Sequence, residues 1–173
     1  RKGVEVISAR GANATSVSEY AIAMAMLLLR GPAYFGTSRL IGGEWPREAF
    51  GRGFELAGKQ LGVIGLGSIG STTARKARGL EMRVQACDPY LPAGNENWNL
   101  ASKVSLDDVL ATSDVVTIHC PLTPETRGMI GAPALARMKK GAILVNSARG
   151  GIVDHAALAA ALGSGHLGGA AID

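Results

Sequence analysis

The sequence contains little cysteine, and its two cysteines do not form a recognisable site. Cys87 and Cys120 each lie near the end of an apolar run, and neither belongs to a CxxC pair or to a cluster of cysteine and histidine. The pattern therefore indicates neither a disulfide framework nor a metal centre. Reduced thiols with a structural role are typical of cytoplasmic proteins, and the cytoplasm is the location that we expect.

Long hydrophobic runs and clusters of one charge are also missing. The longest apolar run, residues 20–29, is well short of the roughly 20 residues that a membrane span needs, so we interpret it as a buried helix. The formal net charge of +4 comes from basic residues that are scattered along the chain. We expect neither a membrane nor a nucleic acid as a partner, whereas a mildly basic protein suits small anionic ligands.

Aromatic residues make up only 5% of the chain, which instead contains 24 glycines. This composition is typical of a globular protein with many tight turns between strands and helices. The length of 173 residues fits one domain. Because the chain begins with Arg1 and shows no signal peptide, we expect residues 1–173 to be a fragment of a longer protein.

From residue 59 onward, short apolar runs alternate with helical segments. The predicted strands are residues 60–64, 83–87, 115–119, 143–146 and 169–172, and the predicted helices are residues 68–79, 106–111, 134–140 and 155–162. Ser105 with Asp108 has the spacing of a capping box, Asp154 is a predicted N-cap, and Thr123 before Pro124 fits another helix start. Alternating strands and helices predict an α/β fold with a doubly wound parallel sheet of the Rossmann type, in three αβα layers.

The first 58 residues are predicted to hold a short strand, a long helix and an arm. The strand covers residues 4–7, and the helix covers residues 17–30 after a capping box formed by Ser16 and Glu19. Residues 34–58 show little periodicity and predict an extended arm, which is long for a connection inside one domain. The arm is either a mobile surface loop or a segment that packs on a second subunit.

The stretch GVIGLGSIG contains a GxGxxG motif formed by Gly65, Gly67 and Gly70. Glycine-rich turns are frequent, but this one follows an apolar strand and opens a helix, as in dinucleotide-binding proteins. The first glycine permits the sharp turn, the second lets a pyrophosphate approach the backbone, and the third lets the helix pack on the strand. The N–H groups of Ser68 and Ile69 at the helix start would face the phosphates.

Asp88 ends the next predicted strand, close to the spacing of the acidic residue in the dinucleotide fingerprint. Its carboxylate could accept hydrogen bonds from both hydroxyls of an adenosine ribose and would repel a 2′-phosphate, which favours NAD over NADP. Asp88 could instead be only a turn residue before Pro89. A methyltransferase, which also places an acidic residue after its second strand, stays open as a further alternative.

The remaining candidates lie where the later strands end, because ligands of open parallel sheets bind outside the carboxyl ends of the strands. Cys120 and Pro121 follow the third predicted strand, residues 146–154 follow the fourth, and Asp173 follows the fifth. Arg149 can hold a carboxylate with its planar fork, although it could also be a solvated surface residue. For His119, His155 and His166 we favour structural roles.

Four stretches, GKQLGVIGLGSIG, HCPLTPETRGMIG, MKKGAILVNSARGGIVD and ALGSGHLGGAAID, resemble the D-isomer-specific 2-hydroxyacid dehydrogenase family, in particular its members similar to 3-phosphoglycerate dehydrogenase. The resemblance implies an NAD-binding domain of an enzyme that transfers a hydride between NAD(H) and a small 2-oxo or 2-hydroxy acid. It also implies that the arm embraces the partner of a homodimer, and that the substrate domain and the C-terminal part lie outside this chain.

The resemblance further implies roles for individual residues. Ser68 and Ile69 would bind pyrophosphate, Asp88 would bind the adenosine ribose, and the adenosine half would be flanked by Cys120, Pro121 and Thr126. The residues expected near the nicotinamide are Ser147, Ala148, Arg149 and Asp173. Arg149 matches the arginine of the family that orients the substrate, and the family's catalytic histidine and glutamate would lie beyond this chain.

The sequence departs from the family pattern at two positions. Glu81 stands where family members usually have glycine after the fingerprint helix, and His155 stands where an acidic residue is common. An NAD(H)-sensing binding protein similar to the transcriptional corepressors of the family is the alternative to an enzyme.

Overall fold

The computed structural model describes residues 3, 7, 9, 11–31 and 36–173. Its centre is a six-stranded parallel sheet with the strand order β3-β2-β1-β4-β5-β6. The strands are β1 (Gln60–Ile64), β2 (Arg83–Cys87), β3 (Ser102–Lys103), β4 (Val115–Ile118), β5 (Ile143–Asn146) and β6 (Gly169–Ile172). The predicted α/β class with a doubly wound sheet is confirmed.

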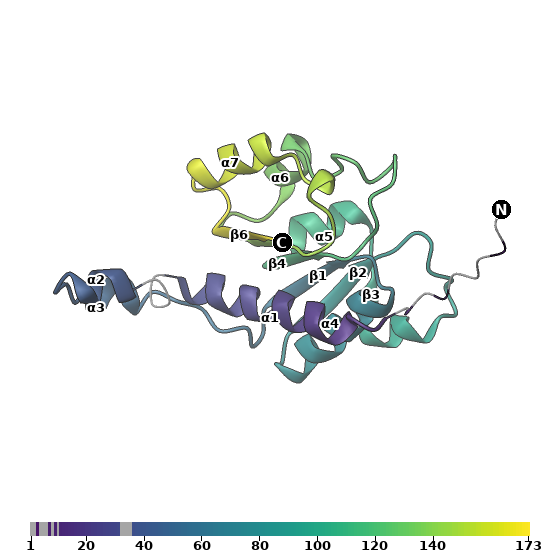
Figure 1. The fold of residues 1–173 in the computed structure, drawn as a ribbon, viewed down its shortest axis with the longest axis horizontal. Helices are drawn as coiled ribbons and strands as arrows, with labels where there is room; N and C mark the ends of the chain where they lie inside the picture. The colour runs from purple at the N-terminus through teal and green to yellow at the C-terminus, as the bar shows by residue number, and fades with distance from the viewer. Residues whose placement is uncertain (1–2, 4–6, 8, 10, 32–35) are drawn as a thin grey trace.

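Helices cover both faces of this sheet (Figure 1). Helices α1 (Ala14–Arg30) and α4 (Ser68–Gly79) lie on one face, while α5 (Leu106–Thr112), α6 (Ala132–Arg137) and α7 (His155–Gly163) lie on the other. Successive side chains of a strand point to opposite faces. Leu61 and Val63 of β1 therefore join the core under α1 and α4, whereas Ile64 joins the core under α5 and α6.

Most of the predicted element boundaries agree with the structure, and the exceptions have local causes. Strand β4 ends one residue earlier than predicted, at Ile118. Helix α6 begins at Ala132, because Pro133 suits the first turn, and it ends at Arg137, because Met138 has an extended backbone. The predicted helix start at Thr123 and Pro124 is wrong: Thr123 and Thr126 bond to each other's backbone N–H and close a turn.

The capping boxes also differ. Ser105 and Asp108 cap α5 reciprocally, and the carboxylate of Asp154 accepts hydrogen bonds at the start of α7, as predicted. The capping box predicted for Ser16 and Glu19 is wrong, because α1 begins earlier, after Asn13. Outside the arm, three short elements were not predicted: β3 and the 3-10 helices η2 (Glu96–Leu100) and η3 (Gly150–Ile152). The predicted strand at residues 4–7 lies outside the described residues, except for Ile7, which is not in a strand.

The described part of the arm, residues 36–58, contains two short helices that the sequence did not predict. Helices α2 (Thr37–Ile41) and α3 (Arg47–Phe50) project beyond the end of α1, away from the sheet (Figure 1). Trp45 contacts the ring of Phe50 edge-on, with 6.0 Å between the ring centroids. The arm still exposes large apolar side chains, because Ile41 is 83% exposed, Trp45 69% and Phe54 61%.

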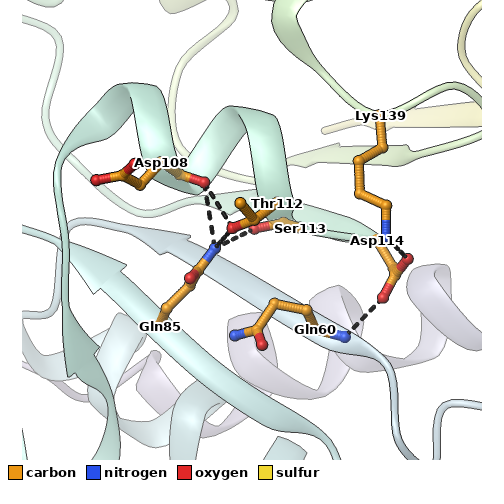
Figure 2. Close-up of polar contacts among 7 residues, drawn as sticks. All are labelled: Gln60, Gln85, Asp108, Thr112, Ser113, Asp114 and Lys139. Carbon is orange, nitrogen blue, oxygen red and sulfur yellow. Dashed lines mark hydrogen bonds and ion pairs between the residues drawn. The ribbon is translucent and has the colours of Figure 1, made fainter.

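Polar contacts bind the sheet to its helices at the amino ends of the strands (Figure 2). Asp114, just before β4, accepts a hydrogen bond of 2.8 Å from the N–H of Gln60 and one of 2.5 Å from Lys139. Burial raises the pKa of Asp114, but the contacts with Gln60 and Lys139 outweigh it and hold this pKa below its ordinary value. The buried amide of Gln85 donates to the hydroxyls of Thr112 and Ser113 at the end of α5. These contacts join β1 and β2 to the end of α5 and to the segments beside β4 and α6.

Candidate functional site

The glycine-rich loop between β1 and α4 has the backbone shape that the motif predicts. Gly65 has a φ of 91°, and a Cβ there would lie 2.9 Å from the backbone N of Cys120. A Cβ at Gly70 would overlap the carbonyl oxygen of Gly65. At Gly67 a Cβ would meet nothing within 4 Å, so this position faces open space above the loop. The first and third glycines therefore serve packing, and the second leaves the approach to the backbone free.

The start of α4 suits an anion. Its N-cap residue is Gly67, and no side chain caps the first turn. Ser68 is exposed and Ile69 half-buried at this end of the helix. Backbone N–H groups at a helix start without a side-chain cap, together with the helix dipole, form a binding site for phosphate.

Asp88 lies beside this loop and is bonded to it. Its Oδ2 accepts a hydrogen bond of 2.8 Å from the N–H of Leu66, and its Oδ1 accepts from the N–H groups of Tyr90 and Leu91. These contacts give Asp88 the turn role that the sequence left open. Three of the about four acceptor positions of the carboxylate are used in this way, which leaves about one for a ribose hydroxyl instead of the two that were expected.

A cavity of about 490 Å³, here called the Asp88 cavity, opens between the carboxyl ends of β1, β2 and β4. Its lining combines predicted site residues with apolar side chains: Ile64, Gly65, Gly67, Cys87, Asp88, Pro89, Tyr90, Leu106, His119, Cys120, Pro121, Thr123, Thr126 and Met129. Burial raises the pKa of both Cys87 and Cys120, so both side chains are neutral thiols at neutral pH. An apolar wall with one carboxylate at its edge suits a flat base joined to a ribose.

A second cavity of about 590 Å³, here called the Arg149 cavity, lies on the other side of Pro121. Its lining residues are Asn13, Val17, Ile69, His119, Cys120, Pro121, Leu122, Ser147, Ala148 and Arg149. The two cavities share His119, Cys120 and Pro121. The structure thus brings the predicted residues of β1, β4 and β5 together along one edge of the sheet.

Asn146 holds the loop that carries Arg149. Its side chain accepts a hydrogen bond from the N–H of Ala148 and donates one of 2.9 Å to the carbonyl of Arg149. The Arg149 guanidinium is exposed and donates to the carbonyl of Ala148. The fork is therefore directed by its own loop while it can still reach a carboxylate.

His119 is the histidine whose side chain borders both cavities. Its Nε2 lies 3.0 Å from the hydroxyl of Thr117, and its buried Nδ1 has no partner among the described residues. Burial lowers the pKa of His119 to about 4, so the ring is neutral at neutral pH. A group of this kind holds no proton to donate as an imidazolium, which favours the structural role expected for it.

Asp173 and Thr126 differ in how they lie relative to the two cavities. Asp173 is bonded through its N–H to the carbonyl of Asn146, but it lines neither cavity. Thr126 is a lining residue whose hydroxyl already donates to the carbonyl of Pro121. The sequence analysis missed Asn13 and Val17, which carry no local signal. It placed Asn146 in the candidate segment 146–154 but gave it no role of its own.

The described residues also bear on metal binding and on membrane insertion. Among the described residues, no group of three or more histidine, cysteine, aspartate or glutamate side chains is arranged to hold a metal ion. No helix in the described part of the chain has the length and apolar character needed to cross a membrane.

Comparison with known proteins gives a consistent result. Residues 22–173 match the family model described as D-isomer specific 2-hydroxyacid dehydrogenase, NAD binding domain. The chain is 45% identical, over 98% of its length, to (S)-sulfolactate dehydrogenase of Chromohalobacter salexigens, of which the match covers 55%. It is 42% identical over its whole length to D-3-phosphoglycerate dehydrogenase of Bacillus subtilis, of which the match covers 33%. The chain thus spans about half or less of these relatives.

A solved structure is similar at the level of the fold. The NAD-dependent formate dehydrogenase of Staphylococcus aureus in complex with NAD superposes with a TM-score of 0.85 and 39% identity, over 93% of this chain and 48% of that one. This chain belongs to the D-isomer specific 2-hydroxyacid dehydrogenase family, as a member of its NAD-binding domains.

Proposed function

We propose that the protein containing this chain is an NAD-dependent dehydrogenase that interconverts a small 2-hydroxy acid and the corresponding 2-oxo acid. The observation that carries the proposal is the pair of adjoining cavities, which share three lining residues and flank a glycine-rich loop with an open approach at Gly67. An extended ligand with a base at one end, phosphates in the middle and a second ring at the other end suits this arrangement. The dehydrogenase names of the relatives favour an enzyme over an NAD(H) sensor.

We assign the three parts of NAD to the glycine-rich loop and the two cavities beside it. The pyrophosphate would lie over Gly67 and the uncapped N–H groups of Ser68 and Ile69, and the adenosine half would occupy the Asp88 cavity. The nicotinamide half would occupy the Arg149 cavity, beside Ser147 and Ala148. Asp173 stays a candidate for the nicotinamide end because its backbone is bonded to Asn146, below the Arg149 loop.

When bound, NAD(H) supplies the hydride chemistry. Arg149 would bind the carboxylate of the 2-oxo acid with two parallel hydrogen bonds and orient its carbonyl group. Asn146 would keep the loop in place through its two backbone contacts. Because the pKa of His119 is lowered to about 4, we assign proton transfer to a histidine and a glutamate outside this chain, as the family resemblance implies.

The test is turnover by the full-length protein with NADH and a panel of 2-oxo acids, followed by the absorbance of the reduced nicotinamide. The panel includes the 2-oxo acids that correspond to 3-phosphoglycerate and to sulfolactate, since the relatives carry those names. Arg149→Lys keeps the charge but loses the fork, so we expect a loss of kcat/KM of about 2 to 4 kcal/mol in transition-state stabilisation. NADH binding with no turnover on any acid would favour the sensor instead, and unchanged kinetics of Arg149→Lys would remove this residue from the mechanism.

The chain of residues 1–173 by itself is proposed to bind NAD(H) weakly and to catalyse nothing. It would lack the proton donor and the second wall of the cleft, and general acid catalysis commonly contributes about 10² to 10⁴-fold. Sustained NADH oxidation by the isolated chain, abolished by Arg149→Ala, would place the proton donor inside it. His119 would then be the first histidine to replace.

We further propose that the protein is a cytoplasmic homodimer without membrane or nucleic-acid partners. The apolar side chains of Ile41, Trp45 and Phe54 are exposed on the arm, which projects from the domain (Figure 1). Such surface is typical of subunit interfaces. Light scattering measures the mass in solution, and a monomer at high concentration with the arm intact would contradict the dimer.

A further inference from the structure

A hollow of about 720 Å³ lies at the β3 edge of the sheet. Its walls are the end of α4, the first residues of β2, the 3-10 helix η2 and strand β3. It shares no lining residue with the Asp88 cavity or the Arg149 cavity. Its volume lies within the range of roughly 300 to 1,000 Å³ that is usual for small-molecule sites.

The charged side chains of this hollow have one sign. Arg78 comes from α4, Arg83 from β2 and Lys103 from β3, and no acidic residue is among the described residues that line the hollow. The ion pairs in the described part of the chain involve other basic residues, so none of these three charges is neutralised by a carboxylate. Three cations from three elements therefore line one concave surface.

Two of the three cations are held against the wall formed by η2. The Nη1 of Arg78 donates a hydrogen bond of 2.6 Å to the carbonyl of Asn99, and the Nζ of Lys103 lies 5.1 Å from the ring centroid of Trp98. The wall itself is anchored, because the indole N–H of Trp98 donates to the carbonyl of Pro92. Cations that are already placed lose less conformational entropy when they bind an anion.

The same wall is tied to the glycine-rich loop. Asn97, the neighbour of Trp98 in η2, donates a hydrogen bond of 2.9 Å from Nδ2 to the carbonyl of Leu66. Two adjacent residues of the wall are thus held by other segments, Trp98 by Pro92 and Asn97 by Leu66. A fixed wall is what distinguishes a binding surface from a group of separately solvated side chains.

We propose that this hollow is a second anion site, which binds a small molecule carrying phosphate groups and more than one negative charge. The guanidinium groups of Arg78 and Arg83 can each form paired hydrogen bonds with phosphate oxygens, and the Lys103 ammonium acts as a point charge beside them. A nucleic acid is not favoured, because the sequence has no runs of basic residues that would follow a nucleic-acid backbone. The site is separate from the proposed cofactor site and does not depend on it.

Calorimetric titration with tripolyphosphate tests the proposal on the full-length protein, in the presence of saturating NADH so that the phosphate site at α4 is occupied. The test variant combines Arg83→Gln with Lys103→Gln, two exposed side chains. The control variant combines Arg75→Gln with Lys140→Gln, which removes the same charge from exposed residues that do not line the hollow. Circular dichroism checks that both variants are folded.

We expect one tripolyphosphate per chain, about tenfold weaker binding in the test variant, and less than about a twofold change in the control variant. Equal weakening in both variants would show a general charge effect and overturn the proposal. Absence of saturable binding would overturn it as well. An RNA or DNA oligonucleotide that binds more tightly than tripolyphosphate and loses affinity in the same test variant would overturn the assignment to a small anion.

Discussion

Replacement of Gly67 and Gly70 by alanine separates ligand binding from folding within one motif. At Gly67 the backbone has φ −72° and ψ −154°, and an added Cβ would meet nothing within 4 Å. Alanine tolerates this conformation, and the loss of glycine's freedom in the unfolded chain stabilises by about 0.4 to 1 kcal/mol. Gly67→Ala should therefore fold with unchanged or slightly higher stability.

The same methyl group should weaken binding, because it occupies the approach along which the phosphates reach the backbone N–H groups of α4. A loss of two charge-assisted hydrogen bonds, each worth about 1.5 kcal/mol or more, corresponds to a decrease of NADH affinity of about a hundredfold. Gly70→Ala should act in the opposite way, because its Cβ would overlap the carbonyl oxygen of Gly65. A shift of the packed backbone that relieves this overlap costs about 1 to 3 kcal/mol of stability.

Urea unfolding and NADH calorimetry give the free energy of unfolding and the NADH affinity of each variant, and these values test the reasoning. The reasoning predicts that Gly67→Ala loses affinity and keeps stability, whereas Gly70→Ala loses stability. If Gly67→Ala binds NADH as tightly as the unmodified protein, the phosphates do not lie over this loop. If Gly70→Ala is as stable as the unmodified protein, the packing argument for the third glycine is wrong.

Three further predictions follow from single side chains. Asp88→Asn should narrow the preference for NADH over NADPH by about tenfold, because the amide no longer repels a 2′-phosphate. Calorimetry with both dinucleotides measures this preference. Equal binding of NADPH and NADH to the unmodified protein would refute the role of Asp88. Asp114→Asn should lower stability at neutral pH by about 1 kcal/mol, since the pKa of Asp114 lies below its ordinary value in the folded state. The stabilisation by Asp114 is then complete above the ordinary pKa of 3.8 and is lost as the pH falls through the lowered pKa of the folded state. The free energies of unfolding of Asp114→Asn and of the unmodified protein, measured in urea, should therefore converge in acid. A difference in stability that persists in acid would contradict the assignment. Glu81 has a φ of 62°, in the left-handed region that glycine adopts without strain, so Glu81→Gly should stabilise the protein by about 0.5 to 1 kcal/mol. Glu81→Ala keeps the strain and is the control, which should show no gain in stability.

The sheet could be predicted because its strands are short apolar runs that end at punctuating residues. All five strands predicted after residue 59 exist, and α4 has the predicted bounds, since a glycine-rich turn before it and the end of the amphipathic pattern define both ends. Strand β3 escaped prediction because Ser102 and Lys103 are polar and exposed, and two residues carry no periodicity. Its pairing with β2 is set by tertiary contact, which a local pattern does not encode.

The sequence predicted those residues of the candidate site that come soon after a predicted strand. The glycine-rich loop, Cys120, Pro121 and Arg149 all stand directly after a predicted strand, so their approach in space follows from a parallel sheet. Asn13 and Val17 reach the Arg149 cavity from α1, which precedes β1 in the chain by the whole length of the arm. Only the packing of α1 on α4 and β5 brings them there, and no spacing in the sequence records it.

The glycine-rich loop also shows why the candidate site is formed before a ligand arrives. Leu66 lies at the centre of the loop with its side chain fully buried, its N–H bonded to Asp88 and its carbonyl bonded to Asn97. A loop whose backbone and side chain are all engaged has little freedom left to lose, so less of the binding free energy is used to order it. The order of the phosphate site therefore depends on Asn97 in η2, a residue that lines neither the Asp88 cavity nor the Arg149 cavity. We therefore expect Asn97 to contribute to dinucleotide affinity without touching the dinucleotide.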